Sequence, residues 1–133
     1  MLNYIVDTHA LIWFLEGNPR LGAQAKAVLE NPASVFFVPL IVLAEATWLV
    51  EHGKTSIPTV EALLDAVDAD PRVTILPLDR SVLEKTLSLG MITEMHDRQI
   101  VATALLLAER GESIAMLTKD ANIRDSGLVS VVW

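Results

Sequence analysis

The sequence predicts a single α/β domain with a parallel β-sheet at its centre. Short apolar segments typical of strands alternate with longer segments whose apolar residues recur at helical spacing. Glycine, asparagine and proline separate these segments, and no linker, repeat or low-complexity stretch interrupts them. The length of 133 residues is that of one domain, which we place over residues 1–133.

Hydrophobic spacing and helix-stopping residues define the elements in the first half of the chain. The apolar residues of "THALIWFLE" recur as on one side of a helix, and Gly17-Asn18-Pro19 stops it. Asn31-Pro32 and Gly53 close two further helices in the same way. The elements expected here are strand 3–7, helix 8–16, helix 20–31, strand 34–39, helix 40–52 and helix 59–68.

The second half of the chain continues the alternation. "DRQIVATALLLAERG" is the clearest helix of the sequence, and Gly111 ends it. "RVTILP", "IAMLTKD" and "VSVVW" are short apolar runs typical of strands, with a turn expected between the last two. The elements expected here are strand 72–77, helix 80–90, helix 97–111, strand 114–120 and strand 129–133.

The composition excludes several classes of protein. The chain is 52% hydrophobic with a mean hydropathy of +0.43, which we attribute to buried subunit contacts. A membrane span is not expected, because the longest apolar run, 35–50, contains Pro39 and Glu45 and is shorter than the roughly 20 residues that a spanning helix needs. The N-terminal segment lacks the basic start of a signal peptide.

Cysteine usage and net charge narrow the expected location and partners. The absence of cysteine excludes disulfides and thiolate metal sites and fits a reducing cytoplasm. The net charge of −7 argues against non-specific nucleic-acid binding through a basic surface. It leaves open a nucleic-acid enzyme whose acidic residues hold metal ions.

Two aspartates lie at the carboxyl ends of predicted strands. Asp7 ends the first strand and Asp120 ends the strand "IAMLTKD". Ligands of open α/β sheets bind at this edge, so the two carboxylates converge if the strands are neighbours. The alternative for each aspartate is a cap on the helix or turn that follows.

Asp97 begins the predicted helix 97–111 and leads its apolar stripe. Positions 97, 100, 101, 104, 105 and 108 share one face, so the carboxylate can point inward from the first turn. The alternative is again a helix cap, because aspartate favours the positive end of a helix.

Glu45 lies within the apolar stretch "LIVLAEATWLV". Its helical neighbours Ile41, Ala44, Trp48 and Leu49 are all apolar. A carboxylate withdrawn from water without compensation costs several kcal/mol or takes up a proton. The alternative is an ion pair with Arg72 or Lys54.

Together the four acids predict a shared carboxylate pocket. Clustered carboxylates repel one another, and a divalent cation removes this repulsion. Oxygen ligands without cysteine or clustered histidine favour Mg²⁺ or Mn²⁺ over Zn²⁺. The histidines at positions 9, 52 and 96 lack zinc-ligand spacing, and we expect them at the surface or at helix caps.

Four blocks of the sequence resemble the PIN-domain family, and specifically the VapC-type toxins of VapBC toxin–antitoxin pairs. They are "IVDTHALIWFLEGNPRL", "LAEATWLVEHGK", "MHDRQIVATALLLAERG" and "LTKDANIRDSGLV", they occur in the order of the family, and they span nearly the whole chain. The resemblance implies a Rossmann-like PIN fold with a central parallel sheet of about five strands and helices around it.

The resemblance also implies a metal-dependent ribonuclease. Asp7, Glu45, Asp97 and Asp120 match the acidic quartet that holds Mg²⁺ or Mn²⁺ in the family, and Thr118 matches a hydroxyl position that supports the site. Basic residues near the pocket are candidates to contact RNA phosphates, with plain solvated charge as the alternative: Arg98, Lys119 and Arg124. The resemblance assigns no role to Asp125.

The implied partners are an RNA substrate, a VapB-type antitoxin that covers the site, and a second copy in a homodimer. Trp13, Phe14 and Trp48 are candidates for an antitoxin groove or a dimer face, with core packing as the alternative. Two other functions remain open: a stand-alone nuclease for RNA maturation or for DNA, and a non-catalytic binding module whose acids are structural.

Overall fold

Five parallel strands form one sheet in the computed structural model, which describes residues 3–133. The order across the sheet is β3-β2-β1-β4-β5, and every neighbouring pair is parallel. The prediction of a single α/β domain around a five-stranded parallel sheet is therefore confirmed. The strands are β1 (Asn3–Val6), β2 (Val35–Pro39), β3 (Val73–Leu76), β4 (Ile114–Leu117) and β5 (Ser130–Val132).

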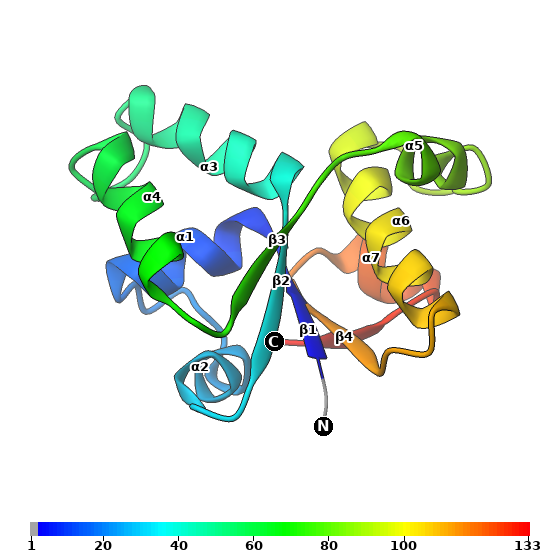
Figure 1. Cartoon of the computed structure of the whole chain (residues 1–133), viewed down its shortest axis with the longest axis horizontal. Coiled ribbons are helices and arrows are strands. Elements are labelled where there is room, and N and C mark those ends of the chain that lie inside the picture. The colour runs from blue at the N-terminus through cyan, green and yellow to red at the C-terminus, as the bar shows by residue number, and fades with distance from the viewer. Residues whose placement is uncertain (1–2) are drawn as a thin grey trace.

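Seven helices within residues 3–133 cover the two faces of the sheet (Figure 1). One face carries α1 (Thr8–Glu16), α2 (Ala23–Glu30), α3 (Leu40–Glu51) and α4 (Val60–Ala69). The other carries α5 (Arg80–Thr86), α6 (Met95–Glu109) and α7 (Ala121–Ser126). α3 also contacts α6, so the two layers meet beyond one end of the sheet.

The strand order creates a switch point between β1 and β4. The chain runs from β1 through β2 to β3 on one side, and then crosses to β4 and β5 on the other. The backbone N–H of Asp7 donates to the carbonyl of Leu117 at 3.2 Å, which ties the ends of these two strands together. A crevice at the carboxyl ends of β1 and β4 is the expected ligand site of such a sheet.

Buried aliphatic side chains hold the layers together. The largest fully buried residues of the sheet are Ile5, Phe36, Met116 and Leu117. Each contributes about 1.5–3 kcal/mol by leaving water. Val101 of α6 is also fully buried, as the predicted stripe of this helix requires.

Several predicted boundaries were wrong. Residues 121–126, expected as a turn, form α7, because the side chain of Asp120 caps the helix by accepting from the N–H groups of Asn122 and Ile123. β4 ends at Leu117, so Asp120 lies beyond the strand. Two helices are shorter than predicted, since α2 begins at residue 23 and α5 ends at residue 86.

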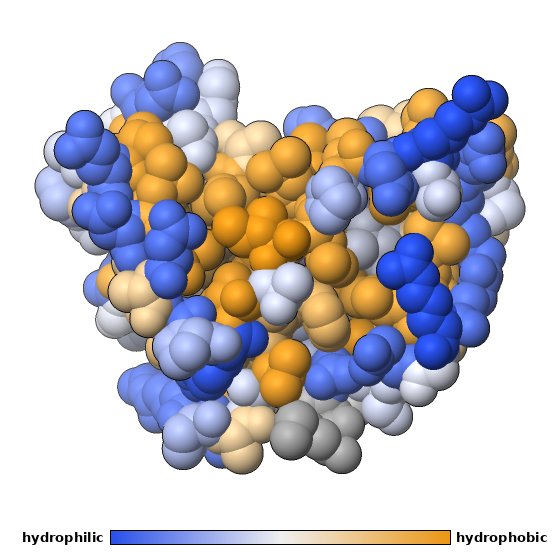
Figure 2. All heavy atoms as spheres, in the orientation of Figure 1, coloured by the Kyte–Doolittle hydropathy of each residue, from blue (hydrophilic) through white to orange (hydrophobic). Residues whose placement is uncertain are grey.

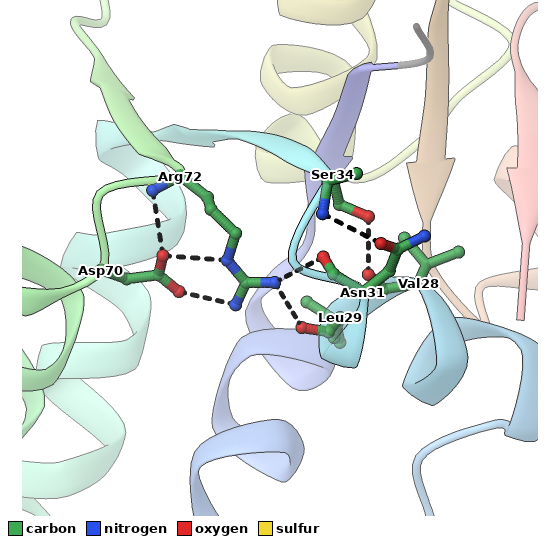
Figure 3. A network of polar contacts seen from close by, with 7 residues as sticks. Val28, Leu29, Asn31, Ser34, Asp70 and Arg72 are labelled. Atoms are coloured by element: carbon green, nitrogen blue, oxygen red, sulfur yellow. Dashed lines mark hydrogen bonds and ion pairs between the residues drawn. The ribbon is translucent and has the colours of Figure 1, made fainter.

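Arg72 ties the start of β3 to the end of α2. Its Nε and Nη2 donate to the Asp70 carboxylate at 3.0 and 2.8 Å, and its Nη1 donates to the carbonyls of Leu29 and Asn31, each at 2.9 Å (Figure 3). The guanidinium also lies 4.9 Å from the ring centre of Phe36. Arg72 therefore has a structural role.

Hydrophobic residues gather across the face of the molecule in Figure 2, over β3 and between the helices on either side. We call Ile75, Leu78, Leu83 and Leu87 the β3–α5 face; these residues are 38–81% exposed. Near them, the side-chain oxygen of Gln99 is buried and has no hydrogen-bond partner among residues 3–133. Among residues 3–133, no helix is both long and apolar enough to cross a membrane.

Candidate active site

A cavity of about 420 Å³ lies at the carboxyl ends of β1 and β4. All four acids predicted from the sequence line it, although they come from four separate segments of the chain. The fold thus brings together residues as far apart in the sequence as Asp7 and Asp120. The lining residues are Asp7, Thr8, His9, Glu45, Glu94, Asp97, Ile100, Lys119, Asp120, Ala121 and Asn122.

Asp7 follows β1 and caps α1. Its Oδ1 accepts a hydrogen bond from the backbone N–H of Ala10 at 3.0 Å. Burial raises the pKa of Asp7, and hydrogen bonds from Thr118 and Ala10 oppose this shift. The capping role that the sequence left as an alternative is present, and the same carboxylate lines the cavity.

Thr118 connects the two strand-end aspartates. The residue is completely buried, and its Oγ1 accepts from the backbone N–H of Asp120 at 3.1 Å. Its hydroxyl also hydrogen-bonds the Asp7 carboxylate. Asp120 in turn caps α7, since its Oδ1 accepts from Asn122 at 2.8 Å and Ile123 at 3.1 Å. Thr118 therefore orients both sides of the switch point.

Asp97 lies in the first turn of α6 and is not its cap. The cap is Glu94, whose Oε2 accepts from the Asp97 backbone N–H at 3.0 Å, and this leaves the Asp97 carboxylate free to line the cavity. Burial, followed by the charges of Asp120 and Glu94, raises the pKa of Asp97 to about 7. Like charges therefore crowd this carboxylate.

Glu45 faces the cavity from the middle of α3. Its neighbours Ala44 and Trp48 are exposed, so the wholly apolar surroundings expected from the sequence are only partly present. The alternative of an ion pair with Arg72 or Lys54 is not found, because Arg72 binds Asp70 and Lys54 forms no ion pair among residues 3–133. The partner of Glu45 is instead His96, with 3.5 Å between Oε2 and Nδ1.

Of the six lining residues that were not predicted as site residues from the sequence, three bear on the chemistry of the cavity: Glu94, His9 and Thr8. Glu94 lines it and caps α6, but glutamate is not among the favoured N-cap residues, so no local pattern in the sequence indicated this role. His9 is exposed and also lines it. Thr8 is 97% buried, since only 3% of it is exposed, and its hydroxyl has no hydrogen-bond partner in the described chain.

Of the three basic candidates, only Lys119 lines the cavity. The guanidinium of Arg98 donates to the carbonyls of Ile92 and Gly90 in the loop before α6. Arg124 lies 3.2 Å from Asp125 on the exposed side of α7, which gives Asp125 a partner. Lys119 instead lies over the ring of Trp13.

The donor set of the cavity suits a hard divalent cation. None of the four predicted acids forms an ion pair with lysine or arginine among residues 3–133. No three acidic or histidine side chains of this part of the chain stand close enough to hold an ion as they are placed, so the carboxylates would have to rotate toward one. The unpartnered Thr8 hydroxyl and the oxygen-only acids fit Mg²⁺ or Mn²⁺ and their bound waters.

Solved structures of bacterial toxin–antitoxin proteins are similar to this chain in fold. VapC20 of Mycobacterium tuberculosis, described as a Sarcin-Ricin loop cleaving toxin, matches with a TM-score of 0.68 and 16% identity, over 96% of this chain and 98% of its own. VapBC2 of Rickettsia felis, bound to a DNA fragment from its promoter, matches with a TM-score of 0.66 and 17% identity, over 98% of both chains.

DNA-bound VapBC of Salmonella typhimurium matches with a TM-score of 0.62 and 17% identity, over 99% of this chain and 98% of its own. At these identities the likeness is one of fold. No curated protein matched the sequence. The model of the PIN domain matches residues 4–127, which is most of the chain. The chain therefore belongs to the PIN-domain family.

Proposed function

We propose that this protein is a metal-dependent endoribonuclease that hydrolyses RNA phosphodiester bonds, and that it is the toxin of a toxin–antitoxin pair. The observation that carries the proposal is the convergence of Asp7, Glu45, Asp97 and Asp120 on one cavity in a PIN domain. The similarity in fold to VapC proteins supports the choice of RNA as substrate. We expect the enzyme to act in the cytoplasm, where such RNA is found.

Asp7, Asp97 and Asp120 would hold one or two Mg²⁺ or Mn²⁺ ions, and Glu45 would act directly or through a water. A bound ion supplies a water of lowered pKa and stabilises the charge of the leaving oxygen. The protein supplies the rest. Thr118 orients Asp7 and Asp120, and one of the acids steers the attacking water. Lys119 offers a positive charge to a substrate phosphate at the same cavity.

An RNA cleavage assay tests this proposal. The purified protein, free of antitoxin, is incubated with a mixed RNA pool in Mn²⁺ and in EDTA, beside Asp97→Asn. A matched control is Asp68→Asn, because Asp68 is an exposed acid of α4 outside the cavity. We expect cleavage in Mn²⁺ by the parent and by the control, none in EDTA, and a loss of at least 10- to 100-fold in Asp97→Asn, the order found for residues around metal sites.

Equal cleavage in Mn²⁺, in EDTA and by Asp97→Asn would reveal a contaminating nuclease and overturn the proposal. A non-catalytic module predicts another pattern: no affinity for Mn²⁺ and no change of any activity in Asp7→Asn. Calorimetric titration with Mn²⁺ distinguishes the enzyme, which should bind the ion, from the non-catalytic module, which should not. This measurement does not require a known RNA target.

The toxin assignment also implies a VapB-type antitoxin. An antitoxin arginine that enters the acidic cavity would make charge-assisted hydrogen bonds to carboxylates that have no lysine or arginine partner among residues 3–133. A small neighbouring gene for a DNA-binding protein, whose product binds this chain and blocks cleavage, is the expected finding. If no such partner exists and the cleavage assay succeeds, the enzyme is a stand-alone nuclease.

A further inference from the structure

Lys119 is held on an aromatic ring at the edge of the acidic cavity. Its Nζ lies 4.6 Å from the ring centre of Trp13, although Lys119 immediately precedes Asp120 in the chain and both line the same cavity. Among the described residues Lys119 forms no ion pair. A flexible lysine beside several carboxylates would ordinarily pair with one of them, so its position on the ring calls for a reason.

The ring of Trp13 is firmly seated. Trp13 is 7% exposed, and the rings of His9 and Trp133 lie 5.4 and 5.9 Å from it. Trp133 in turn packs on Gly22, where an added Cβ would come within 2.4 Å of the Trp133 backbone. The Trp13 ring thus contacts α1 and the chain after β5, and the latter is itself packed against the residue before α2, which makes the ring a rigid surface.

The contact between lysine and tryptophan keeps two opposite charges apart. A cation over the face of tryptophan is stabilised by the ring, so the Lys119 ammonium is satisfied without neutralising a carboxylate. The N–H groups that do not face the ring remain available at the rim, and the acids of the cavity remain available for a cation. Lys119 is the one lysine or arginine among the lining residues, so a chain of net charge −7 offers a polyanion its positive contact here.

We propose that Trp13 is a positioning residue that holds Lys119 as the subsite for a phosphate of single-stranded RNA next to the bond that is cleaved. His9, exposed on the same rim and beside the same ring, lies where it can donate a further hydrogen bond to the strand. The inference deepens the proposed ribonuclease function and rests on it. If Trp13 served only to pack the core, replacing it would not change RNA binding through Lys119. The inference predicts that it does, although Trp13 is nearly buried.

The test measures the binding of a fluorescein-labelled oligouridylate of about 12 nucleotides, a length within the range of single-strand sites. Affinity is measured by fluorescence anisotropy in Mg²⁺ over a series of salt concentrations, with the oligonucleotide checked on a gel. Lys119→Met should weaken binding about two- to fivefold, as for one exposed cationic contact. It should also reduce the slope of log affinity against log salt by about 0.7, the value for one phosphate contact to a single strand.

The Trp13 variants separate positioning from packing. Trp13→Leu should lower the affinity and the salt slope as Lys119→Met does, and Trp13→Phe, which keeps an aromatic face, should restore most of both. In the Lys119→Met background neither Trp13 variant should weaken binding further, because the residue through which Trp13 acts is gone. Lys26→Met, which removes an exposed lysine of α2, is the charge-matched control and should bind like the parent.

The outcomes are distinct. If the parent binds and cleaves RNA while Lys119→Met and Trp13→Leu both match Lys26→Met, the inference is overturned and the ribonuclease proposal stands. If Trp13→Leu weakens binding equally with and without Lys119, Trp13 acts through the fold and the inference is overturned. If the parent neither binds nor cleaves any RNA, the proposed function fails and the inference fails with it.

Discussion

At the scale of single residues, Asp97 makes the stability of the metal-free protein depend on pH. Its pKa is raised to about 7 in the folded state, so folding favours the protonated form. The corresponding stability is fully present below the usual pKa of about 4 and is lost as the pH rises through about 7. The full shift would correspond to about 4 kcal/mol, but solvent screens a partly exposed carboxylate, and we expect on the order of 1–2 kcal/mol.

Urea unfolding in EDTA at pH 5 and pH 8 measures this loss. The parent should be less stable at pH 8, and Asp97→Asn should show a smaller difference between the two conditions. Metal affinity of the parent should rise over the same range, since the cation competes with the proton. If the stability of the parent changes with pH no more than that of Asp97→Asn, the pKa of Asp97 is not raised by burial and by the neighbouring acids.

Glu45 gives a second prediction at this scale. Glu45→Gln removes one of the negative charges that face the cavity, so the metal-free protein should keep its fold and its stability or gain slightly. Mn²⁺ affinity should fall about tenfold, within the range found for residues that support a metal site. Thermal unfolding in EDTA and calorimetric titration measure both quantities. Parent-like metal binding and RNA cleavage would show that Glu45 serves only as a partner of His96.

At the scale of elements, the Arg72 contacts act as a clamp between α2 and β3. Arg72→Met removes the guanidinium that donates to the carbonyls of Leu29 and Asn31 and to the carboxylate of Asp70, and we expect a loss of about 1–3 kcal/mol in the free energy of unfolding. Arg80→Met, which breaks an exposed pair with Glu84, is the control and should cost less than about 1 kcal/mol. Equal losses in the two variants would refute the clamp.

The elements also show what the sequence alone could predict. Apolar periodicity and glycine or proline stops were enough for every strand and for the long helices, because the burial of one face governs both. α7 was missed because it has six residues and buries only Ile123, which is too short for a periodic pattern. Asp7 and Asp120 were predictable because both follow strands, and the pairing of β1 with β4 makes them neighbours.

Other parts of the site depend on tertiary contacts that no local pattern carries. The pairing of Glu45 with His96 joins α3 to α6 across the end of the sheet. Lys119, and not Arg98, is the positively charged residue at the cavity. The Arg98 guanidinium is bound by carbonyls of the loop before α6, and the sequence does not show where these carbonyls lie. The packing of the helices against one another and against the sheet determines both contacts.

At the scale of the whole molecule, the β3–α5 face leads us to expect a homodimer. This face lies along an edge strand and the helix that follows it. A groove beside it is also lined by charged residues of both signs, Asp79, Arg80 and Glu84. A two-fold axis can bring this surface against its own copy and place opposite charges together. The unpartnered oxygen of Gln99 would gain a partner there.

Light scattering of Leu87→Asp tests this expectation. The parent should have the mass of a dimer and the variant that of a monomer, because a buried unpaired carboxylate is unfavourable at an apolar interface. Ser81→Asp adds the same charge on α5 outside this face and groove and should remain dimeric. A parent that is monomeric at all concentrations would overturn the expectation.

The strand order has a consequence for the moment at which the protein becomes active. β1 is synthesised before β2 and β3, yet it also pairs with β4, which is made after both. Asp120 follows β4, so the cavity cannot assemble until the ribosome has translated the codon for Asp120. If the cavity cleaves RNA, this order protects the transcript that encodes the enzyme until β4 and Asp120 have been made and β4 has paired with β1.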